Sequence, residues 1–173
     1  MSTKKATAKA NFAKTPLAEA LIIGKAFKEA LEPLCTMVTL AGSIRQEKEM
    51  IGDIDIVVIP KDDPRIFLDK VKQVIEYEYG ATKKIFGMFQ DRPINIFVTN
   101  TKSYGASLYQ CTGPTKYNMI MRRKAKSAGM KLNEYGLWNR ETNEYIAGEA
   151  EEDIFGALGL KYKPPELRRS KKK

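Results

Sequence analysis

Residues 53–59 constrain the fold of this chain more than any other segment, because they read Asp-Ile-Asp-Ile-Val-Val-Ile. An alternating start followed by an unbroken apolar run is typical of a β-strand. Side chains two positions apart in a strand point to the same side, so Asp53 and Asp55 present two carboxylates together. A second strand is predicted over residues 37–40, and a Gly42-Ser43 turn follows it. The sequence therefore predicts a sheet with paired acidic side chains close to a glycine turn.

Helices and strands alternate along the rest of the chain. An apolar stripe predicts a helix over residues 16–34 with Thr15 as its cap, and an amphipathic pattern predicts another over residues 66–79. Further helices are predicted at 103–108, 117–128 and 149–158, and further strands at 83–89, 94–99, 131–133 and 136–138. The expected fold class is α+β, with a mixed sheet and helices followed by a small α/β unit.

Histidine is absent from the chain, and Cys35 and Cys111 are its only cysteines. This composition excludes Ser-His-Asp and Cys-His catalysis as well as His-ligated zinc. Two cysteines supply neither a disulfide framework nor a zinc site. No apolar run approaches the ~20 residues of a membrane span, and no secretory signal is visible. An intracellular protein without a membrane partner is expected, and its chemistry must use carboxylates, hydroxyls, Lys, Arg or oxygen-bound metals.

The net charge of +9 is concentrated near the two ends of the chain. Residues 1–14 carry +4 and residues 161–173 carry +6, which leaves about −1 for residues 15–160. In the second half, residues 116–131 hold six basic residues and no acid, while residues 141–153 hold six acidic residues and no base. The basic ends are either solvated or bound to a polyanion, and the 116–131 block is expected to face phosphates.

The strongest chemical signal combines the glycine turn with the aspartate pair. Residues 41–45 read Ala-Gly-Ser-Ile-Arg and lie eight residues before Asp53. Two carboxylates at one end of a strand suit Mg²⁺, which prefers oxygen ligands. The amides and hydroxyl of the turn suit a triphosphate. Either half alone is often an ordinary strand end or turn, but the combination indicates phosphoryl transfer.

The order of motifs resembles the nucleotidyltransferase superfamily and, more narrowly, the DNA polymerase X family that includes DNA polymerase beta. The resemblance covers roughly residues 36–168. After the first motif it rests on Tyr104-Gly105-Ala106-Ser107-Leu108, Thr112-Gly113-Pro114, Asn118, Arg122, Lys131-Leu132-Asn133-Glu134-Tyr135-Gly136-Leu137, Glu151-Glu152-Asp153-Ile154-Phe155-Gly156-Ala157-Leu158-Gly159-Leu160 and Pro164-Pro165-Glu166-Leu167-Arg168. It implies a polymerase beta-like palm over residues 15–108 and a carboxy-terminal nucleotide- and DNA-binding subdomain over residues 109–168. The composition adds a basic, disordered tail at 1–14 and a basic tail at 169–173.

The resemblance also implies roles for individual residues. Asp53 and Asp55 resemble the metal-bridging carboxylates, with Mg²⁺ or Mn²⁺ as the cofactor. Nucleotide contacts are implied for Gly42, Ser43, Arg45, Thr112, Gly113 and Asn118. The basic block and the resemblance together imply DNA contacts from Lys116, Arg122, Arg123, Lys124, Lys126, Glu134 and Tyr135. The implied reaction is two-metal transfer from a deoxynucleoside triphosphate to a primer 3′ end in gapped or nicked DNA, carried out by a monomer.

The chain departs from the family at the third catalytic carboxylate. Residues 92–98 read Arg-Pro-Ile-Asn-Ile-Phe-Val, so Asn95 occupies the expected aspartate position. Asparagine can place an oxygen on a metal, but it lacks the charge that lowers the pKa of a 3′-hydroxyl. Asp91 lies four residues, roughly 13 Å, away along an extended chain and is too far to substitute without a bulge. Gln46 similarly stands where a second arginine often follows Arg45, which removes one phosphate contact.

Several interpretations remain open. Asn95 is either a change made to inactivate the enzyme and trap substrate, or the natural residue of a weakened polymerase that binds nucleic acid or nucleotide. Retention of Asp53 and Asp55 favours the first interpretation. Template-independent transfer is a further alternative, because the same core serves that reaction, although the Thr-Gly, Asn and Arg motifs argue for DNA. The place of action is expected to be the cytoplasm, the nucleus or a virus-associated site.

Overall fold

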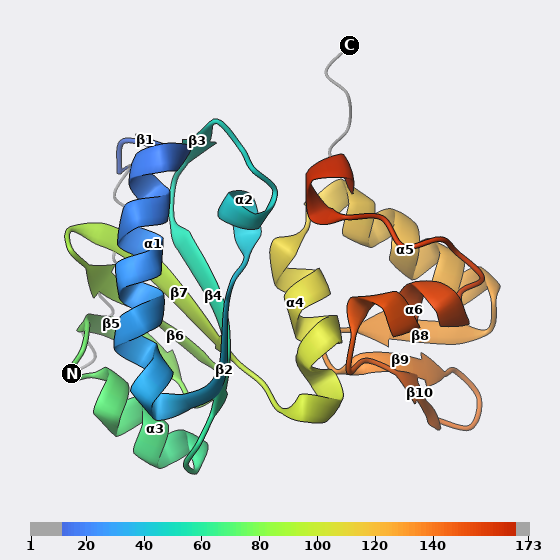
Figure 1. Ribbon diagram of the computed structural model, residues 1–173. Coiled ribbons are helices and arrows are strands. Elements are labelled where there is room, and N and C mark those ends of the chain that lie inside the picture. The colour runs from blue at the N-terminus through green and yellow to red at the C-terminus, as the bar shows by residue number, and fades with distance from the viewer. Residues whose placement is uncertain (1–11, 169–173) are drawn as a thin grey trace, which may run out of the picture.

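The computed structural model describes residues 12–168, so most of the predicted amino-terminal tail and the whole tail at 169–173 lie outside the described residues. Figure 1 shows a sheet lobe built by the first half of the chain and a second lobe built by the rest, with α2 and α4 between them. The first half contains β1 (Thr15–Pro16), α1 (Leu17–Leu31), η1 (Glu32–Leu34), β2 (Cys35–Leu40), α2 (Gly42–Arg45), β3 (Met50–Ile51), β4 (Ile54–Pro60), α3 (Pro64–Val71), β5 (Glu76–Ala81), β6 (Lys84–Phe89) and β7 (Arg92–Val98). The second contains η2 (Thr101–Ser103), α4 (Tyr104–Thr112), α5 (Thr115–Ser127), β8 (Met130–Asn133), β9 (Gly136–Asn139), β10 (Tyr145–Ala147), α6 (Glu151–Ala157) and η3 (Pro165–Arg168).

The sheet lobe is a five-stranded mixed sheet in the order β2-β4-β7-β6-β5. Its β4–β7 pair is parallel and its other pairs are antiparallel. Ile54, Ile56 and Val58 of β4 share a buried cluster with Phe27 of α1 and Phe67 of α3. These helices therefore cover one face of the sheet (Figure 1). Side chains alternate along a strand, so Asp55 lies on the opposite face, toward the second lobe.

The second lobe packs α4, α5 and α6 against a three-stranded antiparallel sheet in the order β10-β9-β8. Its buried cluster includes Tyr109 of α4, Met121 of α5 and Phe155 of α6. On the other side of α4, Leu108 packs with Val57 of β4. Helix α4 thus joins the two lobes and spans the predicted boundary between residues 108 and 109. The predicted α+β class with a mixed sheet is confirmed.

The predicted helix over residues 66–79 is wrong in its second half. Helix α3 ends at Val71, and residues 76–81 form β5, which pairs antiparallel with β6. The apolar spacing that suggested one long helix continues into a segment rich in tyrosine, which favours an extended conformation. Tyr79 stacks on Phe86 of the neighbouring strand with 4.4 Å between ring centroids.

Two details of the first helix also differ from the prediction. Thr15 is not its cap: Pro16 holds the N-cap position, and Thr15 is a buried residue paired with Ile51 in the short β1–β3 sheet. The helix ends at Leu31 and continues as a 3₁₀ turn, because Pro33 lacks the amide that a further α-helical turn requires.

Strand β10 was not predicted. Between residues 12 and 168, no helix combines the length and apolar character that crossing a bilayer requires.

Candidate active site

Asp53, Asp55 and Asn95 meet at one end of the parallel β4–β7 pair. Asn95 is the register partner of Asp55. Its side-chain nitrogen Nδ2 donates hydrogen bonds to Oδ2 of Asp53 at 3.0 Å and to Oδ1 of Asp55 at 2.8 Å. The two carboxylates therefore converge on one point, although Asp53 lies in the bend just before β4 and only Asp55 belongs to the strand.

Burial shapes the electrostatics of this acidic pair. It raises the pKa of Asp55 to about 7, and the neighbouring charge of Asp53 acts in the same direction. The hydrogen bond from Asn95 and the positive charges of Lys84 and Lys48 oppose this rise only in part. Near neutral pH, a bound cation can therefore easily replace the proton of the Asp55 carboxyl group.

Gly42 allows the turn to approach the acids. Its φ is +56°, a conformation that side chains disfavour, and an added Cβ would collide with the carboxylate of Asp55. The main-chain nitrogen of Ala41 donates to the main-chain oxygen of Asp55 at 2.8 Å, which fixes the turn against β4. Glycine at position 42 is therefore required both by backbone conformation and by space.

The acids open into a polar cavity of about 370 Å³ between the lobes. Ser43 Oγ, Gln46 Oε1 and Asn118 Oδ1 are buried polar atoms of its wall that have no hydrogen-bond partner in the part of the chain that the structure describes. Unsatisfied buried polar atoms are rare in native proteins and indicate a ligand or a solvent position. The lining comprises Gly42, Ser43, Gln46, Lys48, Asp53, Asp55, Gln110, Cys111, Thr112, Gly113, Pro114, Thr115, Asn118, Met119 and Arg122.

The carboxy-terminal end of α4 and the start of α5 form the far wall of this cavity. Gly113 has a φ of +68° and precedes a cis bond to Pro114. Asn118 donates from Nδ2 to the main-chain oxygen of Gln110 at 3.0 Å, and Arg122 donates to Oε1 of Gln110 at 2.8 Å. These bonds position Asn118 and Arg122 on the face of α5 that looks into the cavity.

The side chain of Arg45 is not part of the cavity lining. Its guanidinium makes two hydrogen bonds to the carboxylate of Glu151, at 2.9 and 2.7 Å, and one to Oγ1 of Thr112 at 3.1 Å. Glu151 also accepts from Arg168 at 2.9 Å and from the Tyr162 hydroxyl at 3.1 Å. A triphosphate contact from Arg45 would require its guanidinium to leave Glu151.

Burial by itself raises the pKa of Glu151, but the hydrogen bonds from Arg45 and Arg168 outweigh burial and hold the pKa below its ordinary value. This buried cluster links α2 of the sheet lobe to α6 and η3 of the second lobe. No role for Glu151 was predicted from the sequence. The signal available was a glutamate in the first turn of α6, which is also the usual position of an acid that favours helix formation.

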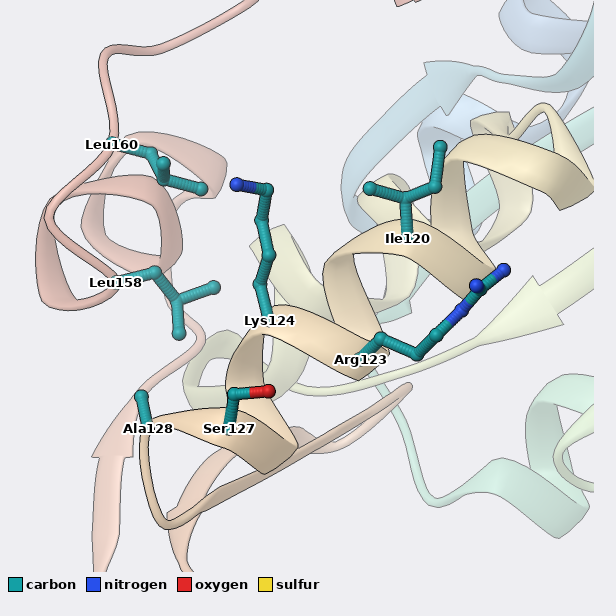
Figure 2. A pocket seen from close by; sticks show the side chains of 7 residues that line it. All are labelled: Ile120, Arg123, Lys124, Ser127, Ala128, Leu158 and Leu160. Carbon is teal, nitrogen blue, oxygen red and sulfur yellow. The ribbon is translucent and has the colours of Figure 1, made fainter.

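The basic block divides between two faces of α5. Arg123 and Lys124 line a separate groove with Ile120, Ser127, Ala128, Leu158 and Leu160, and Figure 2 shows Lys124 between α5 and the two leucines. At 3.6 residues per turn, this face is turned well away from that of Asn118 and Arg122. Lys116 and Lys126 are exposed on α5. The structure does not bring the whole block to the cavity.

Glu134 and Tyr135 occupy the β8–β9 turn, which contacts both α4 and the sheet lobe. The main-chain oxygen of Glu134 accepts from the Ser107 hydroxyl at 2.9 Å. The Tyr135 hydroxyl accepts from Lys83 Nζ of the sheet lobe at 3.2 Å. Neither residue is part of the cavity lining given above.

Hard oxygen ligands are available for a metal, but only two of them are charged. Within residues 12–168, no group of three or more His, Cys, Asp or Glu side chains is placed to hold a metal ion. Asp53 and Asp55 supply two carboxylates that converge within hydrogen-bond distance of one atom, and Asn95 completes the site with a neutral amide. This donor set fits Mg²⁺ or Mn²⁺ at the carboxylate pair.

Comparison with known proteins gives matches of sequence and of fold. Residues 107–169 match the family described as DNA polymerase beta thumb. The chain is 27% identical over 163 residues to the DNA polymerase/3′-5′ exonuclease PolX of Bacillus subtilis, covering 90% of this chain and 28% of that protein. It is 22% identical over 150 residues to the repair DNA polymerase X of African swine fever virus, covering 81% and 86%.

DNA polymerase lambda of Rattus norvegicus is also similar in sequence, with 29% identity over 155 residues, covering 72% of this chain and 27% of that protein. The fold agrees with these sequence matches. A ternary complex of Leishmania infantum polymerase beta matches the structure with a TM-score of 0.78 at 22% identity, covering 92% of this chain and 78% of that one. In sequence the chain is thus similar to DNA polymerases of family X, and it shares the polymerase beta-like fold.

Proposed function

We propose that this protein is a small family X DNA polymerase that adds deoxynucleotides to a primer 3′ end in gapped or nicked DNA. The observation that carries the proposal is the convergence of Asp53 and Asp55 in a polar cavity that also contains unsatisfied acceptors from α2 and α5. The viral relative, of which this chain covers 86%, is named a repair DNA polymerase.

The proposed cofactor is Mg²⁺ or Mn²⁺, held by Asp53 and Asp55. When bound, the metals of a two-metal site neutralise the charge of the triphosphate and of the transition state. The chain's own contribution is to orient the reactants. Gly42 and Ser43 would contact the triphosphate, Thr112 and Gly113 the sugar, and Asn118 the base.

The proposed partners are a deoxynucleoside triphosphate and a primer–template or gapped duplex, bound by a monomer inside the cell. Arg122 lines the cavity, which supports its proposed contact with a template strand there. Lys116, Lys126, Glu134 and Tyr135 remain proposed DNA contacts on the surfaces around it. The division into a palm over residues 15–108 and a carboxy-terminal subdomain over residues 109–168 remains part of this proposal.

Asn95 supports a second candidate function, that of a protein which binds DNA and nucleotide without efficient turnover. Its amide nitrogen donates to both acids, whereas an aspartate would add a third negative charge at the same place. We propose that Asn95 makes this sequence a weak or inactive form of a polymerase, whether the residue was introduced or is natural.

Metal-dependent formation of a ternary complex tests the shared part of both candidates. Titration of dATP into the protein on a one-nucleotide-gapped duplex, with a template thymidine and a dideoxy-terminated primer, measures nucleotide affinity without turnover. EDTA removes the metal, and Asp53→Asn removes one of its carboxylate ligands. We therefore expect either change to lower the affinity for dATP more than tenfold. Asp91→Asn, which changes an exposed aspartate, should have no effect. Equal affinity with Mg²⁺ and EDTA would contradict the proposal.

Metal binding should depend on pH through Asp55. Because its pKa is raised to about 7, the group is mostly protonated below that pH and must lose its proton when the metal binds. We expect the apparent affinity for Mn²⁺ to fall about tenfold per pH unit below pH 7 and to level off above it. Electron paramagnetic resonance of free Mn²⁺ between pH 5.5 and 8.5 measures this. An affinity that is constant over this range would show that Asp55 does not titrate there.

A further inference from the structure

Gln46 is a buried amide in the wall of the cavity, and only one end of it is satisfied. The side chain is 3% exposed. Its Nε2 donates a hydrogen bond to the main-chain oxygen of Thr112, whereas Oε1 has no hydrogen-bond partner among residues 12–168. Because a main-chain oxygen can only accept, the amide cannot be turned around without losing the bond to Thr112. Gln46, which lines the cavity, therefore holds a buried acceptor, and not a buried donor, that lacks a partner in the described chain.

The chemistry of an acceptor limits what Gln46 can bind. Phosphate oxygens are acceptors near neutral pH, so Oε1 cannot bond to a triphosphate. A partner must carry an N–H or O–H group. An arginine, which often occupies this position in the family, would present only donors and would suit phosphate instead. The glutamine thus changes which part of a nucleotide this wall recognises.

The position of Gln46 in the cavity indicates which donor it meets. The cavity lining includes Asp53, Asp55 and Ser43, which are proposed to hold the metal and triphosphate, and Asn118, which is proposed to contact the base. Gln46 follows α2 and is bonded to the main-chain oxygen of Thr112, a residue proposed to contact the sugar. In a nucleotide, the sugar joins the triphosphate to the base. A deoxyribose esterified at its 5′ oxygen carries one remaining donor, the 3′-hydroxyl.

We propose that Oε1 of Gln46 accepts a hydrogen bond from the 3′-hydroxyl of the bound deoxynucleotide, and that Gln46 selects nucleotides that carry this group. The inference rests on the proposed function, because it requires a nucleotide in the cavity. It adds a residue that sets specificity for the sugar. Binding of the hydroxyl satisfies an acceptor that is otherwise buried without a partner, which a nucleotide without the hydroxyl cannot do.

The test compares dATP with 2′,3′-dideoxy-ATP in the wild-type protein. Isothermal titration calorimetry is performed with Mg²⁺ on the gapped duplex with a dideoxy-terminated primer, so that neither nucleotide is incorporated. We expect dideoxy-ATP to bind about 5- to 10-fold more weakly, the range of one hydrogen bond to a neutral group.

Variants separate recognition of the hydroxyl from a structural effect. Gln46→Met keeps the length of the side chain but removes the acceptor, and the two affinities should come within about twofold of each other. Loss of the bond to Thr112 can weaken binding of both nucleotides, but it does not change their ratio. Gln46→Glu retains an acceptor and should retain the preference, even if its charge lowers both affinities. Gln73→Met, at an exposed glutamine, is the matched control and should leave both affinities unchanged.

The outcomes are distinct. Equal binding of dATP and dideoxy-ATP by the wild type overturns the inference, and so does a preference that survives in Gln46→Met. In either case Mg²⁺-dependent dATP binding would still support the proposed function. If dATP does not bind at all, the proposed function fails, and the role of Gln46 fails with it.

Discussion

Replacing Asn95 by aspartate is expected to raise the rate of primer extension by about 100- to 1000-fold, at about 1.4 kcal/mol of transition-state stabilisation per tenfold. Asn95 is the register partner of Asp55 and lies within hydrogen-bond distance of both acids. An aspartate of the same shape would place a third carboxylate where the amide nitrogen now donates. That charge would favour a second metal and ionisation of the primer 3′-hydroxyl. Single-turnover extension of a labelled primer on gapped DNA with Mg²⁺, at pH 8, measures the gain.

Two controls make this result specific to the site. Asn95→Asp combined with Asp53→Asn should show no gain, because the acidic cluster then again contains only two carboxylates. Asn143→Asp changes an exposed asparagine outside the cavity and should behave as the wild type. If Asn95→Asp extends no primer with either Mg²⁺ or Mn²⁺, the chain is not a polymerase that lacks only this charge, and the binding function becomes the better proposal.

Local geometry explains why the acidic centre could be predicted from the sequence. The alternation of side chains in a strand is a property of the backbone, so the spacing of Asp53 and Asp55 is enough to place them on one side. The Gly42-Ser43 turn was predicted from its position after a strand, and the structure gives Gly42 a φ of +56°, which few residues other than glycine tolerate. The role of Asn95 required a resemblance, because nothing local shows that β7 pairs parallel with β4 in this register.

Contacts between distant segments account for most of what the sequence did not reveal. Arg45 and Glu151 are 106 residues apart, and no spacing rule predicts that they meet. As a result, Arg45 was expected to contact phosphate, whereas its guanidinium is bonded to Glu151. The orientation of Gln46 depends in the same way on the main-chain oxygen of Thr112, 66 residues away. The misassigned helix over residues 66–79 has a similar cause, because pairing with β6 decides the conformation of residues 76–81.

Glu151→Gln is expected to lower the free energy of unfolding by about 3–5 kcal/mol at pH 7, the usual effect of removing one partner from a buried ion cluster. Glu151 is 3% exposed, and its carboxylate is bonded to two guanidinium groups. The side chain of Arg168 is fully buried, so a neutral glutamine leaves its charge uncompensated. Urea denaturation, followed by the single tryptophan of the chain, measures the loss.

The pH dependence distinguishes this ion cluster from ordinary packing. The folded protein holds the pKa of Glu151 below its ordinary value of 4.5, so its stabilising contribution is complete above that pH and is lost as the pH falls through the lowered pKa. The difference between wild type and Glu151→Gln should therefore be constant from pH 6 to 8 and shrink below about pH 4.5. Glu152→Gln, which alters the exposed neighbour, should change stability by less than about 0.5 kcal/mol at any pH. A Glu151→Gln protein as stable as this control would mean that the contacts of Arg45 and Arg168 with Glu151 do not hold the two lobes together, and that Arg45 is free to serve the nucleotide.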